Sequence, residues 1–311
     1  MSVTESLDAF RSRRRLRMRR HRRRAYIRSV QLLPSLATLG NAVCGFGAMY
    51  VVTMGSDAAH VGTDPVMVMF SNHRFLVACY LILLAMVFDA LDGRLARWAR
   101  HTTDFGGQLD SMADVISFGA APAMIALALF KDLFNDQVPG LPWMLSRAVW
   151  AIGAIYMSCA AIRLARFNVS NEHGEQHHMS FLGLPSPGAA AAVVGLVLIQ
   201  QDLYLEWQHS SHPVLRGLVV FTTSLLPPVV LASGLLMTSG FRFPHLINKY
   251  LRGRRTFGRL IFALILVGLL VTAHRYTIGV AAIGYAISAP VWWVWLRWRS
   301  RGGRPVTAPV T

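Results

Sequence analysis

Eight long apolar runs constrain the fold of this chain more than any other feature of its sequence. A run of ~20 apolar residues is long enough to cross a bilayer as a helix. Backbone groups inside lipid must be hydrogen-bonded within the span, so these runs are predicted to be helices. We therefore expect an all-α integral membrane protein. The runs cover residues 32–54, 74–97, 106–130, 144–166, 181–200, 217–238, 257–274 and 277–297.

The basic residues predict how the helices are oriented. The formal net charge is +16, and eleven arginines lie within the first 28 residues. If the N-terminus is cytoplasmic, 26 of the 31 Lys and Arg residues fall on the cytoplasmic side. This bias follows the positive-inside rule. We therefore expect a multi-pass protein of the cell membrane, with both termini in the cytoplasm.

The arginine-rich segment before the first span has two interpretations. It could bind nucleic acid, but no aromatic RNA-binding motif accompanies it. A basic block beside a membrane span more often attracts anionic lipids or sets topology. We therefore expect anionic membrane lipids, and not nucleic acid, as its partners. The predicted organisation is a basic cytoplasmic arm (1–31), one membrane domain (32–298) and a short cytoplasmic tail (299–311).

Four aspartates interrupt the apolar pattern, although ionisable residues in membrane spans are rare and usually functional. Asp89 and Asp92 lie near the end of the second predicted span, and Asp110 and Asp114 near the start of the third. Spacings of three and four residues put each pair on one helix face. Four like charges so close repel strongly unless a cation lies among them. Oxygen ligands favour magnesium, manganese or calcium. The alternative interpretation is that the aspartates form helix caps or ion pairs with nearby arginines.

Small residues and one arginine accompany the two acidic pairs. Gly93, Ala96 and Gly106 leave room for a bulky ligand beside the helix backbone. Arg97 can offer a fork of donors to a phosphate. A cation site with these neighbours, near a membrane surface, suits a lipid-linked diphosphate.

Together these residues resemble the signature of the CDP-alcohol phosphatidyltransferase family. The resemblance implies a six-helix membrane core, followed here by two further C-terminal helices. It implies two divalent ions, Mg²⁺ or Mn²⁺, held by the four aspartates, with Asp114 as the base for the incoming hydroxyl. It also implies that Gly93, Ala96, Arg97 and Gly106 help to bind CDP-diacylglycerol. The matching pattern is Asp89-x2-Asp92-Gly93-x2-Ala96-Arg97-x8-Gly106-x3-Asp110-x3-Asp114.

Further segments resemble the phosphatidylserine synthase branch of this family. The resemblance implies transfer of the phosphatidyl group from CDP-diacylglycerol to L-serine, which gives phosphatidylserine and CMP at the cytoplasmic interface. Ser35 stands where this branch usually has Asn. The segments are LPSLATLGNAVCGFGA (33–48), DSMADVISFGAAPA (110–123), RLARFN (163–168), FLGLPSPGAA (181–190) and LMTSGFRFPHLINK (236–249).

Three residues are candidates for binding the acceptor alcohol, namely Ser117, Arg163 and Asn168. Arg163 and Asn168 lie at the predicted cytoplasmic end of the fourth span, where they could bind the carboxylate of an amino acid. The alternative for Arg163 is anchoring of the span at the membrane surface, and for Ser117 it is helix packing.

Two other functions fit parts of the pattern. The same chemistry with glycerol 3-phosphate or inositol phosphate as acceptor would call for a denser basic pocket. A cation-coupled transporter would also use buried acids, but such sites usually lie near the bilayer midplane on broken helices. The sequence leaves open the acceptor, the preferred metal, the acyl-chain preference and the oligomeric state, a homodimer included.

Overall fold

The computed structural model describes residues 35–54, 73–99, 104–137, 143–172, 183–210, 212–241 and 268–301, which contain helices and no strand. Seven helical segments among them have the length and apolar composition to cross a membrane, so the chain is a multi-pass membrane protein. These segments confirm seven of the predicted spans. Most of the eighth, 257–274, lies outside the described residues, as do the arm and most of the tail, so the domain limits stay predictions. The seven are Ser35–Thr53, Arg74–Leu95, Phe105–Phe134, Trp143–Val169, Ser186–Ser210, Pro213–Thr238 and His274–Trp295.

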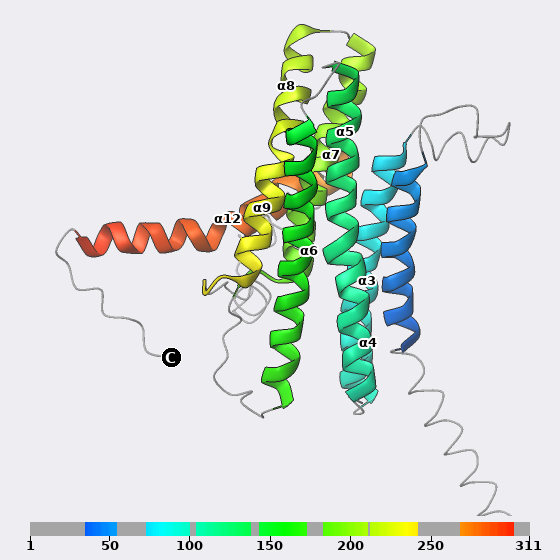
Figure 1. Ribbon diagram of the computed structural model, residues 1–311, viewed down its shortest axis with the longest axis vertical. Coiled ribbons are helices and arrows are strands. Elements are labelled where there is room, and N and C mark those ends of the chain that lie inside the picture. Colours follow the sequence, from blue (N-terminus) through cyan, green and yellow to red (C-terminus); the bar gives the residue numbers. More distant parts are fainter. Residues whose placement is uncertain are drawn as a thin grey trace, which may run out of the picture.

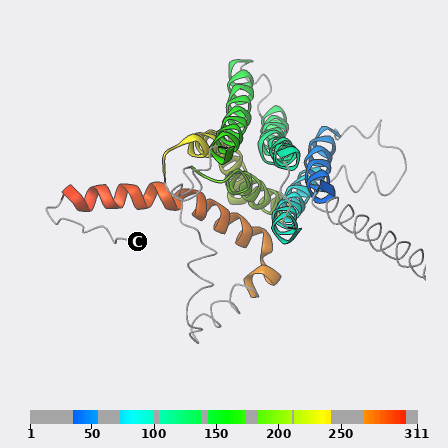
Figure 2. The ribbon, with the colours of Figure 1, turned by 90° about the horizontal axis from the view of Figure 1, so that it is seen from below.

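The helices form an elongated bundle (Figure 1). The helix Ser35–Thr53 lies beside α3, and α4, η1 and α5 form one continuous column next to α6 (Figures 1 and 2). The labelled elements are α3 (Arg74–Ala99), α4 (Asp104–Asp114), the π-helix η1 (Val115–Ala120), α5 (Ala121–Gln137), α6 (Trp143–Glu172), α7 (Ser186–Ser210), α8 (Pro213–Ser224), α9 (Leu226–Thr238) and α12 (His274–Arg301).

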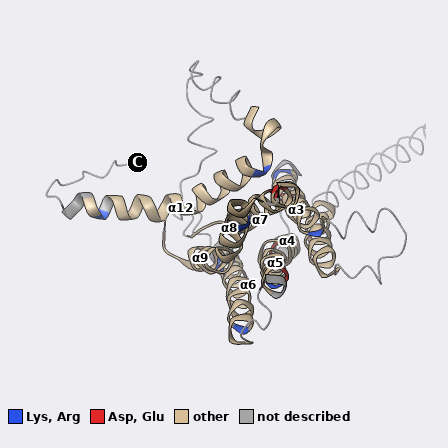
Figure 3. Cartoon of the chain, turned by 90° about the horizontal axis from the view of Figure 1, so that it is seen from above, with Lys and Arg blue, Asp and Glu red and all other residues tan. Residues whose placement is uncertain are grey.

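Helix α7 provides the centre of the bundle. It packs against α3, α5, α8, α9, η1 and α12, and Figure 3 shows it surrounded by helices that carry few charges. The first half of α7 is rich in small, fully buried residues such as Ala189, Ala190 and Val193. Side chains this small let neighbouring helices approach closely inside a membrane. The close packing around α7 therefore fixes the position of Ser186, the first residue of this helix.

A tight turn at Gly183 sets the start of α7. Gly183 has a φ of +90°, and an added Cβ would lie 2.3 Å from the carbonyl oxygen of Met237. Only glycine adopts this conformation easily in such confined space. The amide of Gly183 donates to the Phe241 carbonyl (2.8 Å), and that of Leu184 donates to the Leu236 carbonyl (2.9 Å). The turn is thus held against the end of α9.

The π-helix η1 begins directly after Asp114. Such segments are rare and often occur at functional sites. A Cβ added to Gly45 of the first helix would lie 2.6 Å from the Cα of Ser117, so the first helix almost touches η1. On the other side, the Tyr156 hydroxyl donates to the Phe118 carbonyl at 3.0 Å. The first helix is therefore held against the column that carries two of the aspartates.

Helix α12 has two parts with different surroundings. Its N-terminal part packs along α7, whereas its C-terminal part points away from the bundle (Figures 1 and 2). Pro290 lies inside the helix, and a proline at such a position removes one backbone hydrogen bond. The exposed side chains beyond it include Trp292, Trp295 and Trp298. Tryptophan is enriched where membrane meets water, so these side chains suit contact with lipid.

Candidate active site

Carboxylates from the two acidic pairs meet between α3 and α4. Asp89, Asp92 and Asp110 each offer a carboxylate oxygen, and these oxygens lie within 4.8 Å of one another. Asp92 is only 5% exposed. One buried oxygen of Asp92 (Oδ2) and one of Asp110 (Oδ1) have no hydrogen-bond partner in the part of the chain that the structure describes. The predicted approach of the two pairs is therefore present in the structure.

This arrangement fits a hard divalent cation. Buried carboxylate oxygens without partners are costly, because they have lost water and gained no donor. Like charges this close add repulsion. A cation with a preference for oxygen ligands removes both costs. The oxygens of Asp89, Asp92 and Asp110 thus form a suitable donor set.

Asp114 has different surroundings from the other three acids. It is 7% exposed, and its Oδ1 accepts a hydrogen bond from the Nδ2 of Asn41 at 3.0 Å. It does not belong to the group of three close carboxylates. Asn41 comes from the first helix, as does Thr38, which hydrogen-bonds to Asp92. The first helix therefore supplies polar partners to both acidic pairs.

A cavity of about 210 Å³ opens beside the acids. Three of the four aspartates face it, together with residues of α6 and the start of α7. Gly107 lines it too, and a Cβ added there would meet nothing within 4 Å, so a ligand can approach the backbone of α4. The lining residues are Asp89, Gly107, Asp110, Ser111, Asp114, Arg163, Leu164, Phe167, Asn168, Ser186 and Pro187.

Arg163 is the cationic side chain of this cavity. Its Nη1 donates to the hydroxyl of Ser186 at 2.8 Å. Its Nε is buried and has no hydrogen-bond partner among the described residues. Asp89 and Asp114 are close enough to attract the guanidinium. The arginine is thus held at one point and retains donor capacity for an anionic group.

The structure brings together some of the other predicted residues but not all. Asn168 lines the cavity, and its Nδ2 donates to the Ser111 hydroxyl at 2.9 Å. Ser117 is not among the lining residues; it is fully buried, and its hydroxyl donates to the Ala113 carbonyl at 2.9 Å. Its contacts are those of helix packing.

The predicted CDP-binding residues lie on α3 and α4. Gly93 follows Asp92 on α3, and Gly106 stands one turn before Asp110 on α4. Ala96 and Arg97 also belong to α3, but their side chains lie outside the part that the structure describes. Their roles in binding the nucleotide stay predictions.

Sequence reasoning missed several polar residues of the site. Thr38 and Asn41 are three residues apart on an otherwise apolar helix, and this spacing could have indicated a polar face. Ser186 stands in the Pro-Ser-Pro turn and Ser111 directly follows Asp110. Neither serine has a local signal, because each contacts a residue distant in sequence.

The family of the chain follows from comparison with known sequences. The model of the family described as CDP-alcohol phosphatidyltransferase matches residues 31–232. The chain belongs to this family. All four aspartates, the first helix and all the lining residues of the cavity lie within the matched segment.

Several curated relatives share a printed name. The chain is 35% identical over 175 residues to a CDP-diacylglycerol–serine O-phosphatidyltransferase of Helicobacter pylori, covering 56% of this chain and 63% of the relative. A protein of the same name from Methanocaldococcus jannaschii is 32% identical over 169 residues, covering 54% and 64%. One from Saccharomyces cerevisiae is 37% identical over 130 residues, covering 40% and 42%. The chain thus spans less than two thirds of the length of each.

Proposed function

We propose that this protein transfers the phosphatidyl group of CDP-diacylglycerol to the hydroxyl of L-serine, giving phosphatidylserine and CMP. The observation that carries the proposal is the cavity in which carboxylates and one arginine face each other. The carboxylates suit a diphosphate bound through cations, and the arginine suits the carboxylate of an amino acid. The names of the curated relatives support serine as acceptor.

Asp114 is our candidate for the base. As the serine oxygen forms its bond to the phosphorus, the bond from phosphorus to the CMP oxygen breaks, and the hydroxyl proton must be removed. The Asp114 carboxylate lines the cavity, and Asn41 holds one of its oxygens. A positioned carboxylate of this kind can act as a general base.

Asp89, Asp92 and Asp110 are our candidates for holding the cations, with Asp114 beside them. Two divalent ions, Mg²⁺ or Mn²⁺, would neutralise the diphosphate and stabilise the departing CMP. Arg163 would bind the serine carboxylate, because its planar guanidinium matches a carboxylate in two-point contact. Gly107 leaves the space in which the substrate lies against α4.

We further propose that the site faces the cytoplasm and that the protein resides in the cell membrane. The distribution of Lys and Arg supports this orientation. A site at the level of the lipid headgroups lets a lipid-anchored donor meet a water-soluble acceptor.

An acceptor screen tests the proposed function. Purified full-length protein is given CDP-diacylglycerol and a divalent cation, then L-serine, glycerol 3-phosphate or inositol phosphate, and CMP and the lipid product are measured. We expect product with serine and little with the two phosphorylated acceptors. Efficient transfer to either phosphorylated acceptor, with none to serine, would overturn the proposal. The same assay in thorough chelator should release no CMP, and added Mg²⁺ or Mn²⁺ should restore it.

A further inference from the structure

Helix α12 lies outside the segment that matches the family, yet it reaches the candidate site. The match ends at residue 232, and α12 begins at His274. The N-terminal part of α12 runs antiparallel along α7, so higher residue numbers on α12 meet lower numbers on α7. Contacts at three levels determine its position.

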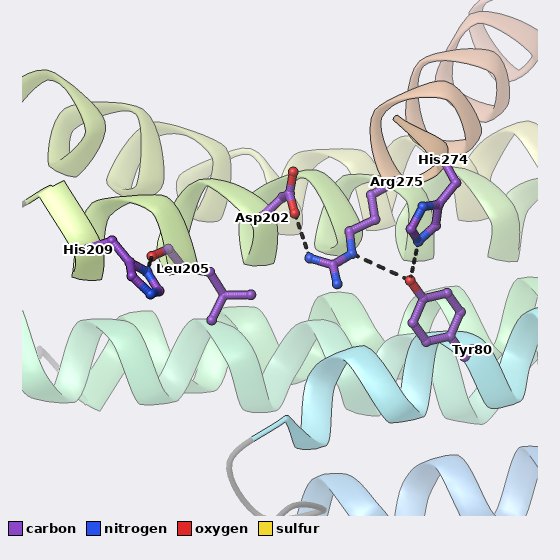
Figure 4. Close-up of polar contacts among 6 residues, drawn as sticks. All are labelled: Tyr80, Asp202, Leu205, His209, His274 and Arg275. Carbon is purple, nitrogen blue, oxygen red and sulfur yellow. Dashed lines mark hydrogen bonds and ion pairs between the residues drawn. The ribbon is translucent and has the colours of Figure 1, made fainter. Parts of the chain in front are cut away.

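The first level is a polar cluster at the end of α7 far from Ser186 (Figure 4). Arg275 donates through Nη1 to Asp202 of α7 at 2.5 Å and through Nε to the hydroxyl of Tyr80 of α3 at 3.4 Å. The same hydroxyl lies 2.6 Å from the Nε2 of His274. The beginning of α12 is therefore tied to both α3 and α7.

The second level is a close contact between two glycines. A Cβ added to Gly195 of α7 would lie 2.7 Å from the Cα of Gly279, and one added to Gly279 would lie 2.6 Å from the carbonyl oxygen of Gly195. Neither position accepts a larger residue without separation of the helices. Side chains farther along α12 can therefore cross over α7.

The third level lies at the site and involves Tyr285. A Cβ added to Gly188 would be only 3.0 Å from the Tyr285 ring (Cε1), so the ring lies against the first turn of α7. Gly188 is two residues after Ser186, which accepts the hydrogen bond from Arg163. The Tyr285 hydroxyl is close enough to the Arg163 guanidinium for an electrostatic interaction.

We propose that Tyr285 is a positioning residue for Arg163, which makes α12 part of the acceptor site. Ser186 holds one nitrogen of the guanidinium, and the phenolic oxygen of Tyr285 provides a second polar neighbour. Two neighbours restrict rotation of a long side chain, so less entropy is lost when the acceptor binds. This inference rests on the proposed function, because it assigns Arg163 to the carboxylate of serine.

Steady-state kinetics of Tyr285→Phe test the inference. This change removes the hydroxyl and retains the ring that packs against Gly188. We expect the KM for serine to rise about three- to tenfold, as for the loss of one hydrogen-bonding group, with the KM for CDP-diacylglycerol and kcat nearly unchanged. Tyr50→Phe is the matched control, because it removes the same hydroxyl from an exposed residue of the first helix, and it should leave all three constants near wild type.

A double-mutant cycle separates positioning from a general structural effect. If Tyr285 acts through Arg163, Tyr285→Phe should have little further effect on the KM for serine once Arg163→Lys is present. Additive effects of the two changes would overturn the inference. The inference would also be overturned if the wild-type protein transfers to serine and Tyr285→Phe has the same KM for serine as the wild type. A wild type that does not use serine would overturn the proposed function, and with it this inference.

Discussion

At the residue scale, the four aspartates divide into three and one. Asp89, Asp92 and Asp110 bring carboxylate oxygens together, and two of these residues retain buried oxygens without partners among the described residues. Asp114 instead receives a hydrogen bond from Asn41. Unpartnered oxygens suit cation binding, whereas an oriented carboxylate suits proton transfer. We therefore expect substitution of Asp114 to affect proton transfer, and substitution of the other three aspartates to affect cation binding.

Asp114→Asn should reduce turnover by about 10²-fold or more, because general-base contributions are typically of that size. The amide has nearly the same shape but cannot accept the proton. Binding of CDP-diacylglycerol should weaken much less. Measurement of kcat in detergent, with donor binding measured separately, tests this expectation.

Asp132→Asn is the matched control for this prediction. Asp132 lies on the same membrane span, near its other end, and pairs with Arg74. Its loss should leave kcat near the wild-type value. A nearly normal turnover in Asp114→Asn would show that another group removes the proton.

At the element scale, the contact between α7 and α12 depends on Gly195. Gly195→Ala should lower the free energy of unfolding by about 1–3 kcal/mol, the usual cost of overpacking, because the new methyl group would meet the backbone of Gly279. Separation of the helices would also move Tyr285, so the KM for serine should rise. Thermal unfolding in detergent and serine kinetics test both effects.

Gly217→Ala provides the comparison for Gly195→Ala. Gly217 lies in α8, and an added Cβ there would meet nothing within 4 Å. Alanine favours helix over glycine by about 1 kcal/mol, so this variant should be unchanged or slightly more stable. Equal stability of the two alanine variants would contradict the close packing of α7 with α12.

At the scale of the whole molecule, the arginine-rich arm is separate in sequence from the candidate active site. The arm precedes the apolar spans, whereas Asp89, Asp92, Asp110 and Asp114 lie on helices of the bundle. Deletion of residues 2–24 should leave catalysis in detergent largely intact. It should weaken the dependence of activity on anionic lipid, because each basic residue near such a surface contributes about 1 kcal/mol of attraction.

Activity in vesicles with increasing anionic-lipid content tests this expectation. A full-length variant with the arm arginines replaced by glutamine controls for chain length and should behave like the deletion. Loss of all activity in a folded deletion variant would instead assign the arm a role in catalysis.

The sequence by itself determined the membrane spans, the two acidic pairs and the family pattern. Each is a local property: about 20 apolar residues suffice to define a span, and a spacing of three or four residues defines a helix face. The approach of α3 to α4 was also predictable, because a short connection joins neighbouring antiparallel helices. These features led to Asp89, Asp92, Asp110 and Asp114 without knowledge of any contact.

Only the tertiary structure decided which distant residues lie beside Asp114 and Arg163. Asn41, Ser186 and Tyr285 come from three different helices, and Asn41 and Ser186 contact partners 73 and 23 residues away in the chain. A helix that is apolar on most sides does not reveal which side faces a neighbour. Close contacts such as Gly195 with Gly279 determine the rotation and register of each pair of helices. The proposed acceptor side of the site depends on this packing, which sequence periodicity does not record.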